Sequence, residues 1–181
     1  MLADTARVSP LKYCALRYFN VAGADPAGRS GQSSPEATHL IKVAVQAATG
    51  RRSGIDVFGT DYPTPDGSCI RDYVHVSDLA QAHLDALRFL RDGGDSAVSN
   101  IGYGNGFSVL QVIDAVKQVS GVDFEVRIRE RRSGDPATLV AANERAKSLL
   151  NWTPRRDDLA TIIRDALAWE RKLPAKAQGM A

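Results

Sequence analysis

The chain of 181 residues has little of several features that mark particular classes of protein. Its two cysteines, Cys14 and Cys69, form neither a metal-binding pair nor a disulfide framework, so we expect reduced thiols and a cytoplasmic protein. The net charge is only +2, with 23 basic and 21 acidic residues interspersed, which argues against a nucleic acid partner. No apolar run is long enough to span a bilayer, and the first residues do not resemble an export signal. We therefore expect no membrane association.

Two catalytic motifs are also missing from the sequence. It has no glycine fingerprint for a dinucleotide and no Tyr-x-x-x-Lys pair, which would place a tyrosine of low pKa beside a lysine on one helix face. None of its three histidines has the spacing of a zinc helix motif, so we expect no metal site. The turn Gly102 to Phe107 is rich in glycine but lacks the spacing of a phosphate loop. Ser108 and Gln111 stand at capping-box spacing, so this turn is better explained as the approach to a helix.

What the sequence does contain is an alternation of short apolar strands and amphipathic helices, which is typical of an α/β protein. Residues 13–20 are predicted to form a strand buried on both faces, and residues 21–35 a loop of the kind that binds ligands. Ser77 or Asp78 is expected to cap the helix that ends near Asp92. Further strands are predicted at 55–58, 98–101 and 124–129, and further helices at 2–7, 35–49, 108–119, 143–150 and 157–172.

Arg71 is the side chain that most strongly suggests a function. It is two residues from Tyr73 on a predicted strand, so both side chains point to the same face. A guanidinium fixed on a strand beside a phenol suits a phosphate, because its planar fork makes two parallel charge-assisted bonds. Arg132 precedes a Ser-Gly-Asp-Pro loop and could grip a second, linked phosphate. A solvated edge-strand charge is the alternative for Arg71, and we favour that interpretation for Arg127 and Arg129.

Four segments of the sequence resemble the carboxyl-terminal half of the UDP-glucose 4-epimerases, which are extended short-chain dehydrogenases. These segments are Leu-Arg-Tyr-Phe-Asn-Val-Ala-Gly-Ala-Asp (16–25), Thr-His-Leu-Ile (38–41), the long segment from Phe58 to Leu79, and Arg-Arg-Ser-Gly-Asp (131–135). The likeness runs in order from about Tyr13 to Leu173. It implies the last part of an NAD-binding Rossmann-type fold together with a smaller substrate-binding domain.

The resemblance also implies a reaction and its partners. The family interconverts UDP-glucose and UDP-galactose by transient oxidation of the sugar at carbon 4, with NAD as the hydride acceptor and a tyrosine as the base. A homodimer is implied for the complete enzyme. Two alternatives stay open: a non-catalytic module that binds nucleotide sugars, and another extended short-chain enzyme such as a nucleotide-sugar dehydratase. The Gly-Thr-Asp-Tyr-Pro-Thr-Pro-Asp-Gly segment (59–67) favours the epimerase.

The resemblance assigns roles to twelve residues. Those at the nicotinamide edge of the cofactor are Tyr18 and Phe19, and the substrate-binding asparagine is Asn20. The segment along the UDP contains His39 and Leu40, and the uracil neighbours are Val57 and Phe58. The diphosphate and nucleoside contacts are Arg71, Tyr73, Arg132 and Asp135. Leu139 occupies a position that limits the size of the sugar, and a leucine there leaves the acceptance of N-acetylated sugars open.

The chain departs from the family at its beginning. In the family, the NAD-binding glycines and the catalytic tyrosine and lysine precede the Leu-Arg-Tyr-Phe-Asn strand, which starts here only about a dozen residues after Met1. We therefore expect the chain to be the UDP-sugar-binding half of an enzyme and to be inactive alone. A truncated gene, a mis-called start or a fragment would each account for the missing half. The expected division is a Rossmann remnant at 1–54, a mainly substrate-binding domain interleaved with Rossmann elements at 55–173, and a disordered tail at 174–181.

Overall fold

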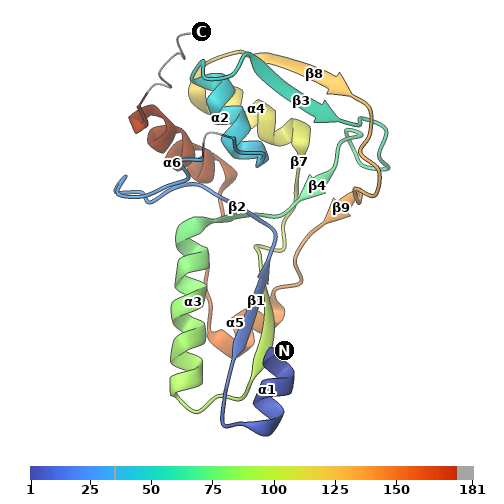
Figure 1. Cartoon of the computed structure of the whole chain (residues 1–181). Coiled ribbons are helices and arrows are strands. Elements are labelled where there is room, and N and C mark those ends of the chain that lie inside the picture. The colour runs from blue at the N-terminus through green and yellow to red at the C-terminus, as the bar shows by residue number, and fades with distance from the viewer. Residues whose placement is uncertain (35, 175–181) are drawn as a thin grey trace.

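A computed structural model describes residues 1–34 and 36–174, arranged as two lobes (Figure 1). Nearly all of the expected tail, residues 175–181, lies outside the described residues. The N-terminal helix lies at the far end of one lobe, and the last described residues belong to the other lobe (Figure 1). The lobes are joined where several very short strands pass between them.

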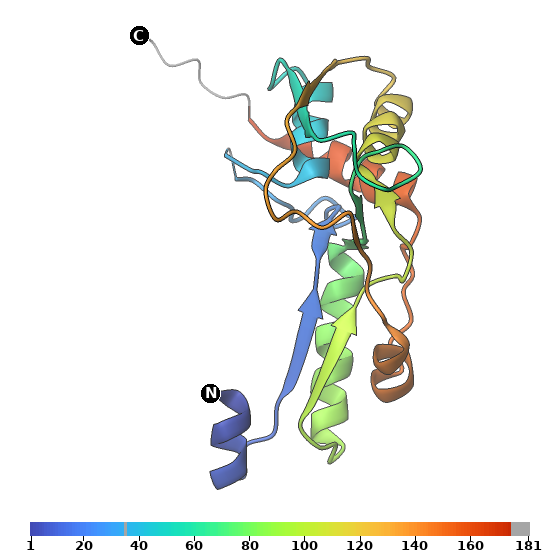
Figure 2. The ribbon, with the colours of Figure 1, turned by 90° about the vertical axis from the view of Figure 1, so that its right-hand side faces the viewer.

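The first lobe is built on two parallel strands. Strand β1 (Cys14–Tyr18) pairs along its whole length with β6 (Ala97–Ile101). Helix α3 (Val76–Arg91) packs against β1, and α5 (Glu144–Leu150) packs against α3 and β6, as both views show (Figures 1 and 2). The short helix α1 (Leu2–Val8) precedes β1 and contributes no buried residue. The core of this lobe comprises Val74, Leu79, Ala82, Ala86, Ile101, Ala146, Leu150 and Trp152.

The second lobe packs three helices against one another. These are α2 (Leu40–Ala48), α4 (Val109–Ser120) and α6 (Leu159–Lys172), with the parallel pair β3 (Gly54–Phe58) and β8 (Glu125–Arg129) beside them (Figure 1). Each helix buries an apolar stripe of helical spacing, which is the condition for packing of this kind. The central side chains of this core are Ile41, Val45, Val57, Val112, Ile113, Val116, Ile162 and Ile163.

Short strands connect the lobes. Strand β2 (Asn20–Ala22) pairs in parallel with β5 (Tyr73–His75), while β4 (Ile70–Arg71) pairs with β7 (Phe107–Ser108) and β9 (Thr138–Leu139). Asp72 lies between β4 and β5, where the chain leaves one sheet for another, and it is fully buried. Its carboxylate accepts hydrogen bonds from the backbone N–H groups of Tyr103, Gly104 and Ala141. Asp72 therefore holds three segments together at the junction.

Most of the predicted elements are confirmed, including the α/β class and the capping box of Ser108 and Gln111. Three details are wrong. Strand β1 is not buried on both faces, because none of its five residues is fully buried and Tyr18 is 46% exposed. Helix α3 is capped by His75, whose Nδ1 accepts from Ser77 N–H, because Asp78 is engaged elsewhere. Helix α2 begins at Leu40 rather than near residue 35, since His39 is its N-cap and is extended.

Candidate functional site

A cavity of about 460 Å³ opens between β3, β4, the start of α2 and the segment after β8. That volume is within the range of small-molecule sites. Four arginines and two aspartates lie in its wall, so its lining is cationic. The charged lining residues are Arg52, Arg71, Arg127, Arg132, Asp56 and Asp135. The uncharged polar and apolar ones include Asn20, His39, Leu40, Phe58, Cys69 and Tyr73.

Arg71 reaches this cavity from β4 and is held by two contacts. Its guanidinium forms an ion pair with the carboxylate of Asp135 and donates to the carbonyl of Ile70 at 2.8 Å. Its side chain is only 13% exposed. A guanidinium that is already oriented in this way loses little conformational freedom when it binds an anion.

Arg132 faces the same cavity but is held differently. Its guanidinium carbon lies 3.8 Å from the centre of the Phe58 ring, in a cation–π contact. Within the described ranges, no hydrogen bond or ion pair involves this guanidinium. Its donors are therefore available for an incoming anion, while those of Arg71 are partly used.

Tyr73 and Asn20 lie side by side in the wall. They are partners in the register of β2 and β5, and the sequence had singled out both. Tyr73 is 3% exposed, and burial raises the pKa of its phenol above the ordinary value despite the nearby Arg71. The hydroxyl is therefore protonated at neutral pH and can donate a hydrogen bond to a ligand oxygen.

The two arginines of β8 both pair with Asp56 but differ in their exposure. Arg127 lines the cavity and donates to Asp56 at 2.7 Å and to Glu125 at 2.6 Å. Hydrogen bonding from Arg127 lowers the pKa of the Asp56 carboxyl. The prediction of a solvated charge is wrong for Arg127, because β8 pairs with β3 and thereby brings it against Asp56. The prediction agrees with the exposure of the Arg129 side chain, which is 52%, although its Nε also lies 3.3 Å from Asp56 Oδ1.

Four of the residues that the resemblance assigned lie outside the wall of this cavity. Val57 is buried in the core of the second lobe, and Leu139 lies on β9, paired with Arg71. Tyr18 and Phe19 are exposed at the end of β1. The other eight line the cavity: Asn20, His39, Leu40, Phe58, Arg71, Tyr73, Arg132 and Asp135. The binding role of all twelve stays a prediction.

A second, more open cavity of about 780 Å³ meets the first at His39. One wall is the loop that follows β2, including Gly23, Arg29 and Gln32. The other wall is the first half of α3, including Val76 and Leu84. The two cavities together offer space for an elongated ligand whose anionic part lies among the arginines.

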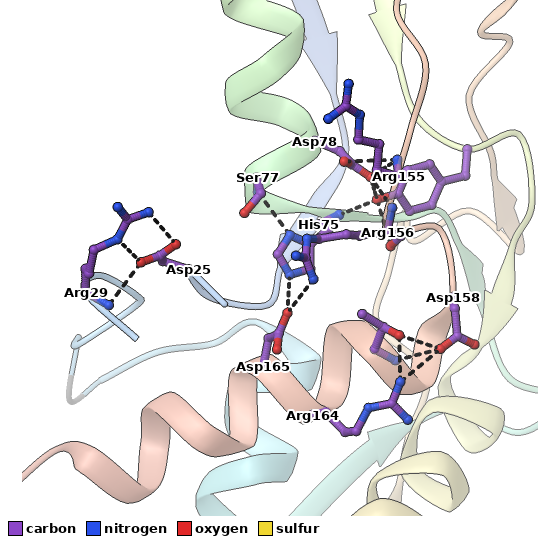
Figure 3. A network of polar contacts seen from close by, with 12 residues as sticks. Asp25, Arg29, His75, Ser77, Asp78, Arg155, Arg156, Asp158, Arg164 and Asp165 are labelled. Atoms are coloured by element: carbon purple, nitrogen blue, oxygen red, sulfur yellow. Dashed lines mark hydrogen bonds and ion pairs between the residues drawn. The ribbon is translucent and has the colours of Figure 1, made fainter. Parts of the chain in front are cut away.

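Behind this loop lies a buried network that the sequence did not indicate (Figure 3). His75 is fully buried, and its Nε2 lies 3.1 Å from Asp165 of α6, while Arg156 contacts the same carboxylate at 3.3 Å. Burial lowers the pKa of His75 below its ordinary value, although Asp165 opposes this. A Cβ atom at Gly23, whose φ is +81°, would lie 2.6 Å from the His75 ring, so this position requires glycine. The start of the loop is thus packed directly on the network.

Figure 3 also shows Asp78 in contact with the segment that leads to α6. Its carboxylate accepts from the backbone N–H groups of Arg155 and Arg156 and from the Tyr103 hydroxyl at 2.7 Å. The pKa of Tyr103 is raised, chiefly by burial. This network joins the two lobes behind the cavities, and no short-range pattern in the sequence indicated it.

The described residues thus form an α/β protein with parallel strands and a cationic cavity, which is lined by the second lobe and by the short strands that connect the lobes. Residues 1–102, more than half of the chain, match the NAD dependent epimerase/dehydratase family. The chain belongs to this family.

Relatives of known sequence and structure agree with this assignment. The chain is 56% identical to a UDP-glucose 4-epimerase of Azospirillum brasilense over 96% of this chain and 50% of that protein. The crystal structure of UDP-glucose 4-epimerase from Brucella ovis in complex with NAD matches 93% of this chain and 52% of its own, with 44% identity and a TM-score of 0.89. The enzyme from Bifidobacterium longum, in complex with NAD+ and UDP, matches 94% and 51%, with 32% identity and a TM-score of 0.86.

The chain thus spans about half the length of the relatives it matches. Among the helices in the described part of the chain, none is both long enough and apolar enough to cross a membrane.

Proposed function

We propose that this chain is the UDP-sugar-binding half of a UDP-glucose 4-epimerase. The observation that carries the proposal is the convergence of Arg71, Arg132, Tyr73 and Asn20 on one cavity, from three separate parts of the sequence. Two guanidinium groups suit two linked phosphates, and the two neighbouring polar groups suit the sugar oxygens beside them. The relatives named for this activity support the same function.

In this proposal the residues of the chain bind and orient the substrate. The face of Phe58, with Arg132 stacked on it, suits a flat base, and Asp135 suits a ribose hydroxyl as an acceptor. Leu139, which is paired with Arg71 through β9, lines neither cavity and is not part of the wall beside the proposed sugar position. Placing the sugar in the open cavity beside His39 leaves it next to the loop after β2 and the first turns of α3.

The described residues fit only the edge of an NAD cofactor. Tyr18 and Phe19 are exposed aromatic side chains at the carboxyl end of a parallel strand, where such folds bind dinucleotides. The glycine turn that could resemble a pyrophosphate cradle is filled, because Gly102 and Gly104 lie against Asp72 and Ala141 or Asn143. When bound, NAD supplies the hydride acceptor, and the residues of this chain do no more than border it.

The remaining half would pack on a surface that is now exposed. We name the α3 face as the surface formed by Val76, Leu84 and Leu87, which are 37%, 50% and 52% exposed, together with the neighbouring Tyr18 and Phe19. The aromatic rings of Tyr18 and His83 are in contact across this surface. Such a face normally packs on another layer of an α/β fold, and relatives of twice the length supply a candidate for that layer. The division into a Rossmann remnant and a substrate domain belongs to this proposal, as does a homodimer of the complete enzyme.

One alternative has a specific observation in its favour. Arg71 is already held in the cavity by Asp135 and by the carbonyl of Ile70, so the chain could bind an anion on its own, as a non-catalytic binding module. Reading the genomic codons upstream of Met1 separates the two: an in-frame Tyr-x-x-x-Lys favours the enzyme, and a stop codon favours the module.

The binding proposal is tested by calorimetry on the 181-residue chain. We expect UDP to bind, UMP to bind at least about tenfold more weakly because the second phosphate is missing, and ADP to bind more weakly than UDP because the base differs. No heat of binding with UDP, or equal affinity for UDP and UMP, would refute the arginine clamp.

A further inference from the structure

The loop between β2 and α2, residues 23–39, connects the two cavities but has little structure of its own. Among its described residues, the internal contacts lie around the bridge between Ala24 and Gly31, where Asp25 N–H donates to Ser30 O at 2.9 Å. Yet the loop forms a wall of the open cavity and ends at His39, which lines both cavities. Something outside the loop must therefore hold it in place.

The last turns of α6 provide one set of contacts. Trp169 donates from Nε1 to the carbonyl of Gln32 at 3.2 Å, and its ring lies against Gly31 so closely that a Cβ there would be 2.5 Å away. One turn further on, Lys172 donates to the carbonyl of Gly28 at 3.3 Å. The helix thus contacts the loop near its tip and near its middle.

Lys42 provides the second set of contacts. It lies in the first turn of α2, three residues after His39, and donates to the carbonyl of Gln32 at 2.6 Å. The same ammonium group donates to Glu170 Oε2 at 2.5 Å. The Gln32 carbonyl therefore receives two donors, one from α2 and one from α6. Because a backbone carbonyl has two lone pairs, both bonds can form at once.

Arg51 fixes α6 to the other end of α2. Its guanidinium donates to the carbonyl of Glu170, in the last turn of α6, and to that of Pro174, just beyond the helix. Its Nε lies 3.3 Å from Glu170 Oε1, an ion-pair distance without the geometry of a hydrogen bond, so this buried oxygen has an electrostatic partner only. Lys42 and Arg51 thus bind Glu170 from both ends of α2.

Both members of the Lys42–Glu170 ion pair are buried, and burial makes an ion pair energetically costly. Lys42 is 6% exposed and Glu170 is 1% exposed. Removing two charges from water is energetically unfavourable, and a packed apolar pair of similar volume is often as stable. An ion pair in this place is therefore better explained by the position it imposes than by the stability it contributes.

We propose that Lys42, Glu170 and Trp169 form a latch that positions loop 23–39 against the sugar end of the ligand. The latch residues are positioning residues, since they lie behind the loop and act through Gln32 and Gly31. This inference rests on the proposed function, because it assumes that the nucleotide occupies the arginine-lined cavity and the sugar the open one. The latch therefore governs the affinity for the sugar more than the affinity for UDP.

Two variants of the 181-residue chain test the latch. The double variant K42M/E170L replaces the ion pair by apolar side chains of similar volume, and W169F keeps an aromatic ring but removes the N–H donor. The matched control is K117M, which removes a surface lysine paired with the exposed Asp123 at the far end of α4. The first measurement, without ligand, is hydrogen exchange at the amides of Asp25, Gly28 and Arg29, which are hydrogen-bonded within the loop. We expect exchange at least about tenfold faster in both latch variants and unchanged in the control.

The second measurement compares the binding of UDP and UDP-glucose by calorimetry. We expect the latch variants to keep their UDP affinity within about twofold and to lose about fivefold or more of their UDP-glucose affinity. Equal losses for both ligands, or unchanged exchange of the loop in both variants, would overturn the latch. If the unaltered chain binds neither ligand, the proposed function fails, while the exchange experiment still decides whether the latch holds the loop.

Discussion

Arg71 and Asp135, 64 positions apart in the sequence, form an ion pair inside the arginine-lined cavity. The carboxylate occupies one side of the guanidinium, and the carbonyl of Ile70 occupies another. A phosphate that binds Arg71 must therefore share it with Asp135 or displace that carboxylate. Arg132, whose donors are not engaged within residues 1–34 and 36–174, is the side chain that an arriving diphosphate can reach without such competition.

The first prediction is that R71A weakens UDP binding by about 2 kcal/mol, or roughly 30-fold, because it removes one partner of a charge-assisted bond. We expect R71K to be intermediate, since lysine keeps the charge but not the bidentate fork. R164A is the matched control, because Arg164 lies on α6, is 60% exposed, and neither it nor its partner Asp158 is in the wall of the cavity. Calorimetric titration of UDP measures all three. Unchanged affinity in R71A would restore the interpretation of Arg71 as a structural charge.

The second prediction concerns Asp72, whose carboxylate binds three backbone N–H groups in the interior. We expect D72A to destabilise the chain by about 3 kcal/mol or more, because it leaves three buried donors without partners. D72N should also be destabilising, since its amide nitrogen would face at least one of these N–H groups. Urea unfolding followed by circular dichroism gives the free energy of unfolding. A loss below about 1 kcal/mol in both variants would contradict this role.

The third prediction concerns stability as a function of pH. Burial lowers the pKa of His75 in the folded chain below the value of about 6.5 expected in the unfolded chain. Between these two values the unfolded chain binds a proton that the folded chain does not, so stability falls as the pH is lowered through 6.5. The dependence should approach at most about 1.4 kcal/mol per pH unit. Asp165 opposes the shift, and Arg156 and Asp78 also act on the ring.

H75N is the appropriate variant for this test. Asparagine can still cap α3 but does not titrate. The slope of folding stability against pH between about pH 5 and 6.5 should therefore be smaller in H75N, in which His39 and His83 are unchanged. Urea unfolding at several pH values measures the slope. An equal slope in both proteins would assign the dependence to other groups.

The local features of the fold were predictable because their signals lie close together in the sequence. Ser108 and Gln111 cap α4 across three residues, and Gly50 ends α2 with the positive φ that only glycine adopts easily. Arg71 and Tyr73 also reached the same cavity as their spacing indicated. Short-range patterns thus predicted the elements and part of the site.

The features that the sequence did not predict depend on partners that are far away along the chain. Asp72 binds N–H groups that lie 31, 32 and 69 residues away, and nothing near it in the sequence indicates this. Asp78 has the residue type of a helix cap, but the distant Arg155 and Arg156 N–H groups bind it instead. The position of Lys42 relative to Glu170, 128 residues away, is likewise a product of helix packing. Pairing over such distances is set by the complete fold.

The fourth prediction is that the 181-residue chain shows no epimerase activity when it is given UDP-galactose and NAD. It lacks the Tyr-x-x-x-Lys pair that would supply the general base, and binding the nucleotide alone does not stabilise a transition state. A coupled assay for UDP-glucose measures this, with a complete relative as the positive control. Activity above background in the purified chain would mean that other residues perform the proton transfer.

The last prediction is that the isolated chain associates with itself through the α3 face. Leu84 and Leu87 expose apolar surface on one side of α3, and the neighbouring strand β1 pairs with β6 alone among the described strands, so it offers an unpaired edge. Covering apolar surface gains about 25 cal/mol per Å², which favours association.

We therefore expect sedimentation to show concentration-dependent oligomers, and the variant L84E/L87E to remain monomeric because two charges cannot be buried unpaired. The control is R88A, which changes an exposed residue of the same helix that pairs with Asp85. Hydrogen exchange locates the contact: protection of Tyr18 and Phe19 should rise with concentration in the unaltered chain and stay constant in L84E/L87E. A monomer at all concentrations would mean that the α3 face stays exposed to water without association. It would then favour the independent binding module over the half of a larger enzyme.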